Sequence, residues 1–359
     1  MIKCPYIIYM DNQLIGIVTW PKAANPGTVF QAYALQQFIN RIPTLKAEVI
    51  NYKYIPPSKK KQGLLRTILK PFLRWRYNKI VSFSRKIVKF PQERMLNHSE
   101  LYLVNERYDQ FILGSDQIWN VNFTGFDKTF FLDFVKNKRK GAYAPSIGRD
   151  DWPEECKDEI RQLLADFSFI GVREKGAVDV VQPLTDKPVH WSLDSTFLFS
   201  KSDWELVAKP FQQKGDYIFV YSIMKTQSLR AVAERLSKMT RLPIIEHCGI
   251  RKLVPTAKRI PNRCADTWLS YLMNAKYVVT DSFHGCAFSI NTNRTFFVVV
   301  TANGSRIYSI LELFGLEDRI VNNIEDIDLS KNIDWDSVNI RLEDRRKESQ
   351  DWLKSSLIN

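Results

Sequence analysis

The sequence predicts an α/β protein built from two Rossmann-like domains that face each other across a cleft. Strand-sized apolar runs alternate with helix-length segments over residues 14–54 and again over 217–300, a pattern typical of parallel sheets covered by helices. The chain has 359 residues, which suits two domains of about 100–200 residues each. We place the first domain at residues 1–205, the second at 206–330, and a helical segment at 331–359 as a candidate to cross back to the first domain.

In the first domain the expected elements follow the apolar pattern in order. Leu14-Ile-Gly-Ile-Val-Thr-Trp reads as a buried strand, and the segment after Gly27 has the mixed apolar spacing of a helix. The later strands are short runs rich in β-branched and aromatic residues. The predicted strands are 14–20, 47–52, 110–114, 140–144, 169–172 and 189–193, and the predicted helices are 28–42, 153–166 and one that begins near residue 174.

A polar stretch at residues 199–215 separates this series from a second one. The alternation of apolar runs with amphipathic segments resumes at Tyr217, so we expect a second set of strands and crossover helices. The predicted strands are 217–222, 242–247, 275–280 and 295–300, and the predicted helices are 227–239, 266–274, 285–291 and a polar helix within 333–357.

Composition and cysteine content exclude several classes of protein. Apolar residues make up 45% of the chain and charged residues 25%, and no apolar run approaches the roughly 18 residues of a membrane span. Pro5 and Asp11 interrupt the apolar start, so we expect no signal peptide. The five cysteines show no metal-ligand spacing. We therefore expect no metal site, no disulfide framework and a cytoplasmic location.

The net charge of +13 is concentrated in one segment. Residues 58–94 hold twelve Lys or Arg residues and one Glu, a net charge of +11 that leaves +2 for the rest of the chain. Apolar residues such as Leu65, Leu69 and Phe72 recur there at helical spacing, which predicts a basic amphipathic insertion. It would either rest on an anionic membrane surface or pack its apolar side on its own domain. We expect no nucleic-acid partner, because no nucleic-acid-binding module accompanies the charge.

Two groups of polar residues follow predicted strands. His284 lies in Thr280-Asp-Ser-Phe-His-Gly285, where a histidine at a helix start would expose its imidazole to the cleft and could exchange protons at neutral pH. Alternatively, Ser282 caps that helix and His284 is only a packed polar residue. Ser115-Asp116-Gln117 follows the strand 110–114, the edge where open α/β sheets bind their ligands. We assign Asp194 to a structural turn, and His190 and His247 to packing.

Six blocks of residues together resemble the polysaccharide pyruvyl transferase family. The resemblance extends over about residues 12–320, with the blocks in the family's order, and the second and sixth are the most specific of them. The blocks are Asn25-Pro-Gly27-Thr-Val-Phe-Gln31, Gly114-Ser-Asp-Gln117-Ile-Trp119-Asn120, Tyr143-Ala-Pro-Ser146-Ile-Gly148, Val172-Arg-Glu174, Leu193-Asp-Ser-Thr196 and Thr280-Asp-Ser282-Phe-His284-Gly285.

This resemblance implies a fold like the two-domain glycosyltransferase B class and a reaction that moves the pyruvyl group of phosphoenolpyruvate onto two hydroxyls of a sugar. The acceptor would be a galactose-type sugar in a surface or capsular polysaccharide precursor, either lipid-linked or free, and no cofactor besides the donor is implied. His284 matches the family's acid/base, and Arg173 matches an arginine that could hold carboxylate or phosphate oxygens. The implied substrate-binding residues are Asn25, Gly27, Gly114, Ser115, Asp116, Gln117, Ser282, Phe283, Gly285 and Arg306.

One departure from the family pattern concerns this anion site. Some members carry an arginine two residues before the histidine, a position held here by Ser282, and we take Arg306 as the cation that could substitute. The alternatives are that Arg306 is a surface residue, that Arg173 pairs with Glu174 at a helix start, and that Asp116 caps a turn. At the level of function, a nucleotide-sugar glycosyltransferase and a non-catalytic glycan-binding protein remain the competing hypotheses.

Overall fold

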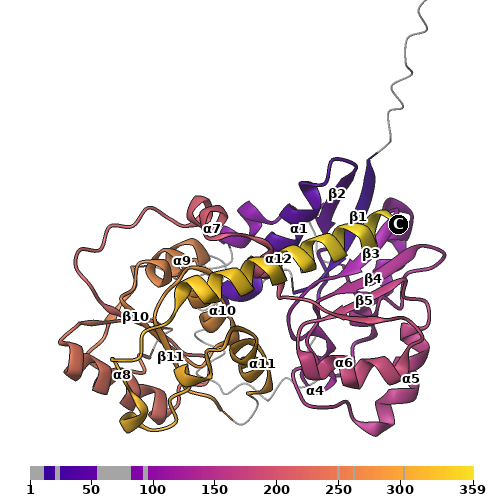
Figure 1. The fold of residues 1–359 in the computed structure, drawn as a ribbon. Helices are drawn as coiled ribbons and strands as arrows, with labels where there is room; N and C mark the ends of the chain where they lie inside the picture. The colour runs from indigo at the N-terminus through magenta and orange to yellow at the C-terminus, as the bar shows by residue number, and fades with distance from the viewer. Residues whose placement is uncertain are drawn as a thin grey trace, which may run out of the picture.

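The chain forms two separate parallel sheets (Figure 1), and in both the order of the strands across the sheet differs from their order in the sequence. The computed structural model describes residues 12–20, 25–54, 82–91, 96–248, 251–261, 263–301 and 304–359. The first sheet has the order β2-β1-β3-β4-β5-β6 and the second the order β11-β10-β7-β8-β9. The predicted fold class is confirmed: each half is a doubly wound α/β unit of the Rossmann type.

Apart from β9, the strands form where short apolar runs were expected. Five of the eleven described strands, β3, β5, β7, β8 and β11, are buried along their whole length, as is usual for strands of a parallel sheet covered by helices. The first sheet consists of β1 (Gln13–Val18), β2 (Leu45–Val49), β3 (Gln110–Leu113), β4 (Arg139–Tyr143), β5 (Phe169–Val172) and β6 (Val189–Trp191). The second consists of β7 (Ile218–Tyr221), β8 (Ile244–His247), β9 (Lys258–Arg259), β10 (Tyr277–Thr280) and β11 (Phe296–Val298).

The helices also match the predictions, with three differences. The stretch 199–215 contains a helix, α7, because Ser200 and Asp203 form a capping box. Helix α10 begins at Phe283 rather than Gly285, and α11 was not predicted. The helices are α1 (Pro26–Asn40), α5 (Glu154–Leu164), α6 (Lys175–Val181), α7 (Lys201–Val207), α8 (Gln227–Thr240), α9 (Ala265–Met273), α10 (Phe283–Asn291), α11 (Ser305–Phe314) and α12 (Trp335–Ile358), with short turns η2 (Gln117–Trp119), α4 (Val121–Thr124) and η5 (Ser195–Leu198).

An aromatic cluster joins the two halves. Phe30 of α1 lies 5.1 Å from Trp204, 6.3 Å from Trp268 and 5.4 Å from Phe288, measured between ring centroids. All four side chains are fully buried. Aromatic rings bury large areas and favour such tilted and edge-to-face arrangements, so this cluster holds α1 of the first half against α9 and α10 of the second.

Helix α12 contacts both halves of the molecule, as its yellow ribbon shows (Figure 1). Near its middle, Arg346 donates to Asn291 at 2.8 Å and to the carbonyl of Phe197 at 2.7 Å. Towards its end, the carbonyl of Leu357 accepts a hydrogen bond from Gln110 of β3 at 3.0 Å. The helix is therefore fixed to elements of both sheets.

Only part of the basic segment 58–94 is described. Residues 58–81 and 92–94 lie outside the described residues, so the expected amphipathic insertion is largely untested. Within 82–91, Val88 is buried and the backbone carbonyl of Lys89 accepts hydrogen bonds from Val49 and Gln36. This piece therefore packs on its own domain. No helix in the described part of the chain combines the length and apolar character needed to cross a bilayer.

Candidate functional site

His284 lies between the two halves, at the start of α10. Ser282 is the N-cap residue of this helix, and its hydroxyl accepts a hydrogen bond from the backbone N–H of Gly285 at 3.4 Å. The capping alternative for Ser282 is therefore realised, and it places His284 in the first turn. The imidazole is only 5% exposed, less than the sequence suggested, although it lines a pocket between the halves.

A buried carboxylate stands behind this histidine. Oδ2 of Asp194 lies 3.7 Å from Nε2 of His284, and it accepts hydrogen bonds from Oγ of Ser115 at 2.7 Å and Nη1 of Arg173 at 2.8 Å. Oδ1 accepts two more from Thr196. Burial opposes ionisation of this carboxyl, but His284 and Arg173 outweigh it and hold the pKa of Asp194 far below its usual range. Asp194 is therefore a fixed negative charge beside the imidazole.

The first turn of α1 packs against the other side of the histidine ring. A Cβ atom on Gly27 would lie 2.1 Å from Cγ of His284, so only glycine permits this approach. Asn25, the N-cap of α1, accepts hydrogen bonds from the N–H of Gly27 and from the hydroxyl of Tyr221, both at 3.0 Å. Because Tyr221 ends β7, this contact joins the two halves beside His284.

The pocket in front of His284 has a volume of about 440 Å³ and is lined by both halves. Its two acids are already occupied: Asp281 accepts from Ser222 and from the N–H groups of residues 223 and 224, and Asp116 accepts from Thr28 and Gln117. The lining residues are Asn25, Asp116, Gln117, Asn120, Asn122, Phe123, Gly148, Arg149, Ile223, Met224, Asp281, Ser282, Phe283, His284, Thr301, Gly304, Arg306 and Ile307.

Two arginines of this lining have no acidic partner within the described residues. Arg149 is exposed, and Arg306 is partly buried with its Nε atom unbonded. Burial and the nearby charge of Arg173 lower the pKa of Arg306, but an arginine stays charged in proteins. The pocket therefore offers two guanidinium groups without acidic partners beside two carboxylates, and Arg306 is not the surface residue of the alternative hypothesis.

Arg173, in contrast, does not line this pocket. Its guanidinium is buried, pairs with Asp194 and with Glu174 at 3.1 Å, and lies 4.2 Å from the ring centre of Phe283. Burial disfavours its charge, but the two carboxylates more than compensate and raise the pKa of Arg173. The ion pair with Glu174 that we considered as an alternative is present, and Asp194 is an additional partner that the sequence did not suggest.

The residues after β3 divide between the pocket and the layer behind it. Asp116 has a φ of 88°, a left-handed conformation that is uncommon outside glycine and that recurs at functional sites. It caps η2 through its own side chain, and it still lines the pocket with Gln117. Gly114 and Ser115 lie behind them, since a Cβ on Gly114 would meet Thr19 at 2.9 Å. Gly285 also faces inward, against Thr280.

Sequence reasoning missed several residues that the structure brings together here. Asp194 was assigned to a turn, and the pocket residues Asn120, Asn122, Phe123 and Arg149 were not singled out. Asn120 belongs to the second block of the family resemblance, which was the only indication in the sequence that it lies at the site. The other three histidines lie elsewhere: His98 pairs with Asp133 at 2.9 Å, His190 stacks on Trp352 at 4.5 Å, and His247 is buried at the end of β8.

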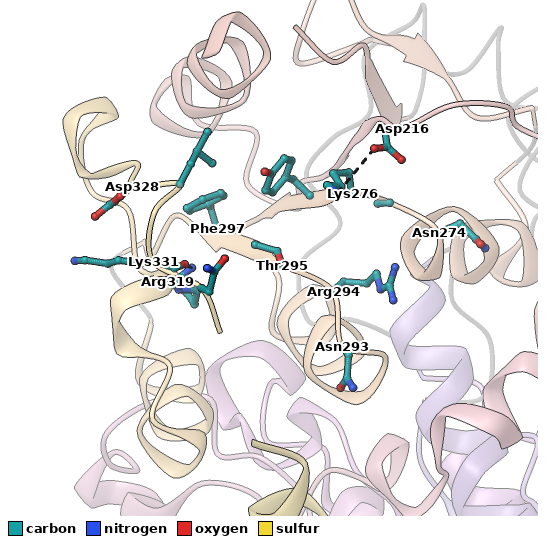
Figure 2. Close-up of a pocket in the computed structure, with 14 residues that line it drawn as sticks. Asp216, Asn274, Lys276, Asn293, Arg294, Thr295, Phe297, Arg319, Asp328 and Lys331 are labelled. Carbon is teal, nitrogen blue, oxygen red and sulfur yellow. Dashed lines mark hydrogen bonds and ion pairs between the residues drawn. The ribbon is translucent and has the colours of Figure 1, made fainter. Parts of the chain in front are cut away.

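A second pocket, of about 510 Å³, lies at the opposite edge of the second sheet, where β7, β10 and β11 begin. Figure 2 shows that its charged groups do not converge: Arg294 and Lys331 lie at different ends, and Lys276 lies beside Asp216 at 4.0 Å. None of the expected site residues lines it. We therefore assign the functional site to the pocket beside His284.

No cluster of three metal-ligating side chains occurs among the described residues. The site instead offers a histidine beside a fixed carboxylate, two arginines without acidic partners, and the starts of α10 and α11. Such a set can move a proton and hold an anion.

Comparison with known families decides the classification. The family model for polysaccharide pyruvyl transferase matches residues 25–303. The chain belongs to this family. The matched range includes Asn25, Asp116 and His284, which line the pocket, and Arg173 and Asp194, which lie directly behind it. No functionally curated protein matches the chain.

Solved structures similar to this family member share its fold at low identity. A putative UDP-N-acetylglucosamine 2-epimerase from Listeria monocytogenes is 12% identical, with a TM-score of 0.53 over 95% of this chain and 91% of that chain. The S. aureus MnaA–UDP co-structure is 12% identical, with a TM-score of 0.50 over 94% and 90%. The UDP-GlcNAc 2-epimerase from Methanocaldococcus jannaschii is 9% identical, with a TM-score of 0.50 over 92% and 91%. These matches confirm the GT-B-like fold and show the fold alone.

Proposed function

We propose that the protein transfers the pyruvyl group of phosphoenolpyruvate onto two hydroxyls of a galactose-type sugar in a surface polysaccharide precursor. The product is a cyclic ketal, and phosphate is released. The observation that carries this proposal is the position of His284, which faces the pocket between the fixed charge of Asp194 and the backbone of Gly27.

The reaction balances as an addition and a substitution at one carbon. A proton adds to the methylene carbon of phosphoenolpyruvate, and the neighbouring carbon becomes an oxocarbenium-like centre. One sugar hydroxyl adds there, the second displaces phosphate, and both lose their protons. One of these protons replaces the proton given to the methylene carbon, and the other leaves with phosphate. The site must therefore supply a proton donor and hold two anionic groups.

His284 is the proposed proton donor. In this proposal the carboxylate of Asp194, 3.7 Å from Nε2, orients the ring, as a buried carboxylate does for catalytic histidines in general. Gly27 packs on the opposite side of the ring, so the imidazole has little freedom to turn. In this proposal Ser115 and Arg173 position Asp194, and Asp194 positions His284.

Arg306 is the proposed contact for the donor's phosphate or carboxylate. It stands in the first turn of α11, whose N-cap residue Gly304 has no side chain to cap the helix. The N-terminus of α10 lines the same pocket. Helix N-termini attract anions, so the start of α10 would act together with the Arg306 guanidinium on the donor.

The test is to incubate the purified protein with phosphoenolpyruvate and a panel of galactosides, and to measure phosphate release together with product mass. We expect one phosphate per acceptor and a mass increase equal to pyruvate less water. A parallel reaction with a nucleotide sugar tests the glycosyltransferase alternative. Phosphoenolpyruvate that stays intact with every acceptor, together with transfer from the nucleotide sugar, would refute the proposal.

A further inference from the structure

The two walls of the pocket beside His284 differ in chemistry. The wall from the second half carries His284, Arg306, Asp281 and two helix N-termini. The wall from the first half, which we call the amide wall, carries three amides (Gln117, Asn120 and Asn122) and the ring of Phe123, together with Asp116 and Arg149. Because the proposed donor contacts His284 and Arg306 lie on the other wall, the amide wall remains for the other substrate.

Resting on the proposed function, we propose that this amide wall is the acceptor subsite and that Phe123 stacks on the apolar face of a neutral pyranose. Ligand sites in proteins combine an aromatic or apolar surface with a few placed polar groups. Residues 117–123 have both in one short segment, at the carboxyl end of β3.

Of the three amide side chains on this wall, two keep N–H donors that bind no other described residue. Nδ2 of Asn120 donates to Oε1 of Gln117 at 3.1 Å, and Oδ1 of Asn120 accepts from the N–H of residue 123 at 3.2 Å. Asn120 is thus used within the segment. The Nε2 group of Gln117 and the whole amide of Asn122 have no partner among the described residues. An amide both donates and accepts, which suits the hydroxyls of a sugar.

Gly148 keeps these amides accessible. It has a φ of +67°, and a Cβ there would lie 2.5 Å from Nδ2 of Asn120 and 2.7 Å from Oε1 of Gln117. The absence of a side chain lets the two amides lie against the backbone of residue 148, and the exposed Arg149 follows directly.

Phe123 is held in place while its ring stays open to solvent. The side chain is 59% exposed, yet its backbone carbonyl accepts from the hydroxyl of Tyr54 at 3.0 Å, and its ring packs edge to face against Trp20 with centroids 5.8 Å apart. An exposed aromatic ring on a fixed backbone keeps one apolar face available to a ligand at little entropic cost.

The test measures sugar binding directly, with no turnover required. Saturation-transfer NMR compares the unmodified protein with the variants Phe123→Ala and Phe123→Trp. The ligand is methyl β-galactoside, and inorganic phosphate is present to occupy the proposed anion site beside Arg306. The matched control is Tyr102→Ala, which removes a ring that is 63% exposed and lies outside the pocket. We expect a saturation-transfer signal from the sugar with the unmodified protein and with the variants Phe123→Trp and Tyr102→Ala. The signal should be lost with Phe123→Ala.

Kinetics provide a second readout. Phe123→Ala should raise the acceptor KM about tenfold, equivalent to about 1.4 kcal/mol, and leave the phosphoenolpyruvate KM unchanged. In Gln117→Glu a carboxylate oxygen can still accept the hydrogen bond from Asn120, but the free Nε2 donor is lost. This variant should therefore also raise the acceptor KM. Sugar binding that survives Phe123→Ala, or that is absent from the unmodified protein, overturns the subsite. Sugar binding that depends on Phe123 without any pyruvyl transfer supports the subsite and overturns the proposed function instead.

Discussion

Oδ2 of Asp194 lies 3.7 Å from Nε2 of His284, although the two residues are 90 positions apart and belong to different halves of the molecule. The same oxygen binds Ser115 and Arg173 at shorter distances. The charge beside the imidazole is therefore set by contacts from three segments of the first half. This arrangement separates the residue that would move a proton from those that hold it in place.

Replacing His284 should remove catalysis and leave binding. We expect His284→Ala to lower turnover by at least about a hundredfold, because a general acid acts mainly in the transition state. Phosphoenolpyruvate affinity should stay within about tenfold. Single-turnover assays and calorimetric titration measure the two effects. A variant that keeps its turnover within about tenfold would remove His284 from the acid/base role.

Asp194→Asn tests the positioning role, since the amide keeps the shape and loses the charge. We expect kcat to fall by about a hundredfold or more, with little change in the KM for phosphoenolpyruvate. Glu246→Gln is the matched control: this carboxylate is equally buried and binds the N–H groups of Leu253 and Val254 away from the pocket. Both variants should lower the melting temperature, and only Asp194→Asn should lower kcat. Equal effects on kcat would assign Asp194 to folding.

Substitutions of the two arginines near Phe283, Arg306 and Arg173, should affect different properties of the protein. Arg306→Met should raise the KM for phosphoenolpyruvate about tenfold or more, because a hydrogen bond between charged groups contributes about 1.5–3 kcal/mol, and should leave stability nearly unchanged. Arg173→Met should cost about 3–5 kcal/mol of stability, since it leaves Asp194 and Glu174 buried without their partner. Denaturant unfolding and steady-state kinetics test both variants. The opposite assignment of effects would mean that Arg173 holds the donor.

Gly27→Ala tests the close approach of α1 to the histidine. The new methyl group would overlap the imidazole of His284, so we expect the ring to shift and activity to fall by at least about tenfold, consistent with the sensitivity of catalysis to small misplacements. Gly176→Ala in α6 is the control, because its Cβ would meet nothing within 4 Å. Activity in the Gly27 variant equal to that of the control would show that the turn can move away without consequence.

His247 should make stability depend on pH. Burial, aided by Arg263, lowers the pKa of His247 from 6.5 to about 3. The unfolded chain therefore binds a proton first as pH falls through 6.5, and the folded protein loses stability until the pH reaches the folded value. From pH 8 to pH 5 this loss is about 2 kcal/mol. His247→Gln should remove this contribution, as urea unfolding at the two pH values would show. An identical pH dependence in the variant would contradict the effect.

Most helices and strands, and several residues of the site, could be predicted from the sequence. Strands such as β10 were predictable because a buried apolar run has few other solutions, and His284 was recognisable from its place after that strand. The predicted start of α10 at residue 285 was two residues late, because Ser282 caps the helix, as the alternative for His284 assumed. Helix α7 was missed although Ser200 and Asp203 carry a capping signal.

The rest of the site depends on contacts that no local pattern encodes. Asp194 reads as a turn residue because its side chain does cap η5, and its contacts with Ser115, Arg173 and His284 come from separate segments. Phe123 looked like an ordinary loop residue, since exposure is decided by the tertiary fold. Arg173 matched a motif, but its burial under Phe283 could not be read from spacing.

Helix α12 limits how the two halves can move. Its 24 residues make a rod about 36 Å long, and a rod attached to both halves resists any motion that pulls its attachment points apart. Its hydrogen bonds to Gln110 in the first half and to Asn291 in the second would have to break before the two halves could separate along the helix.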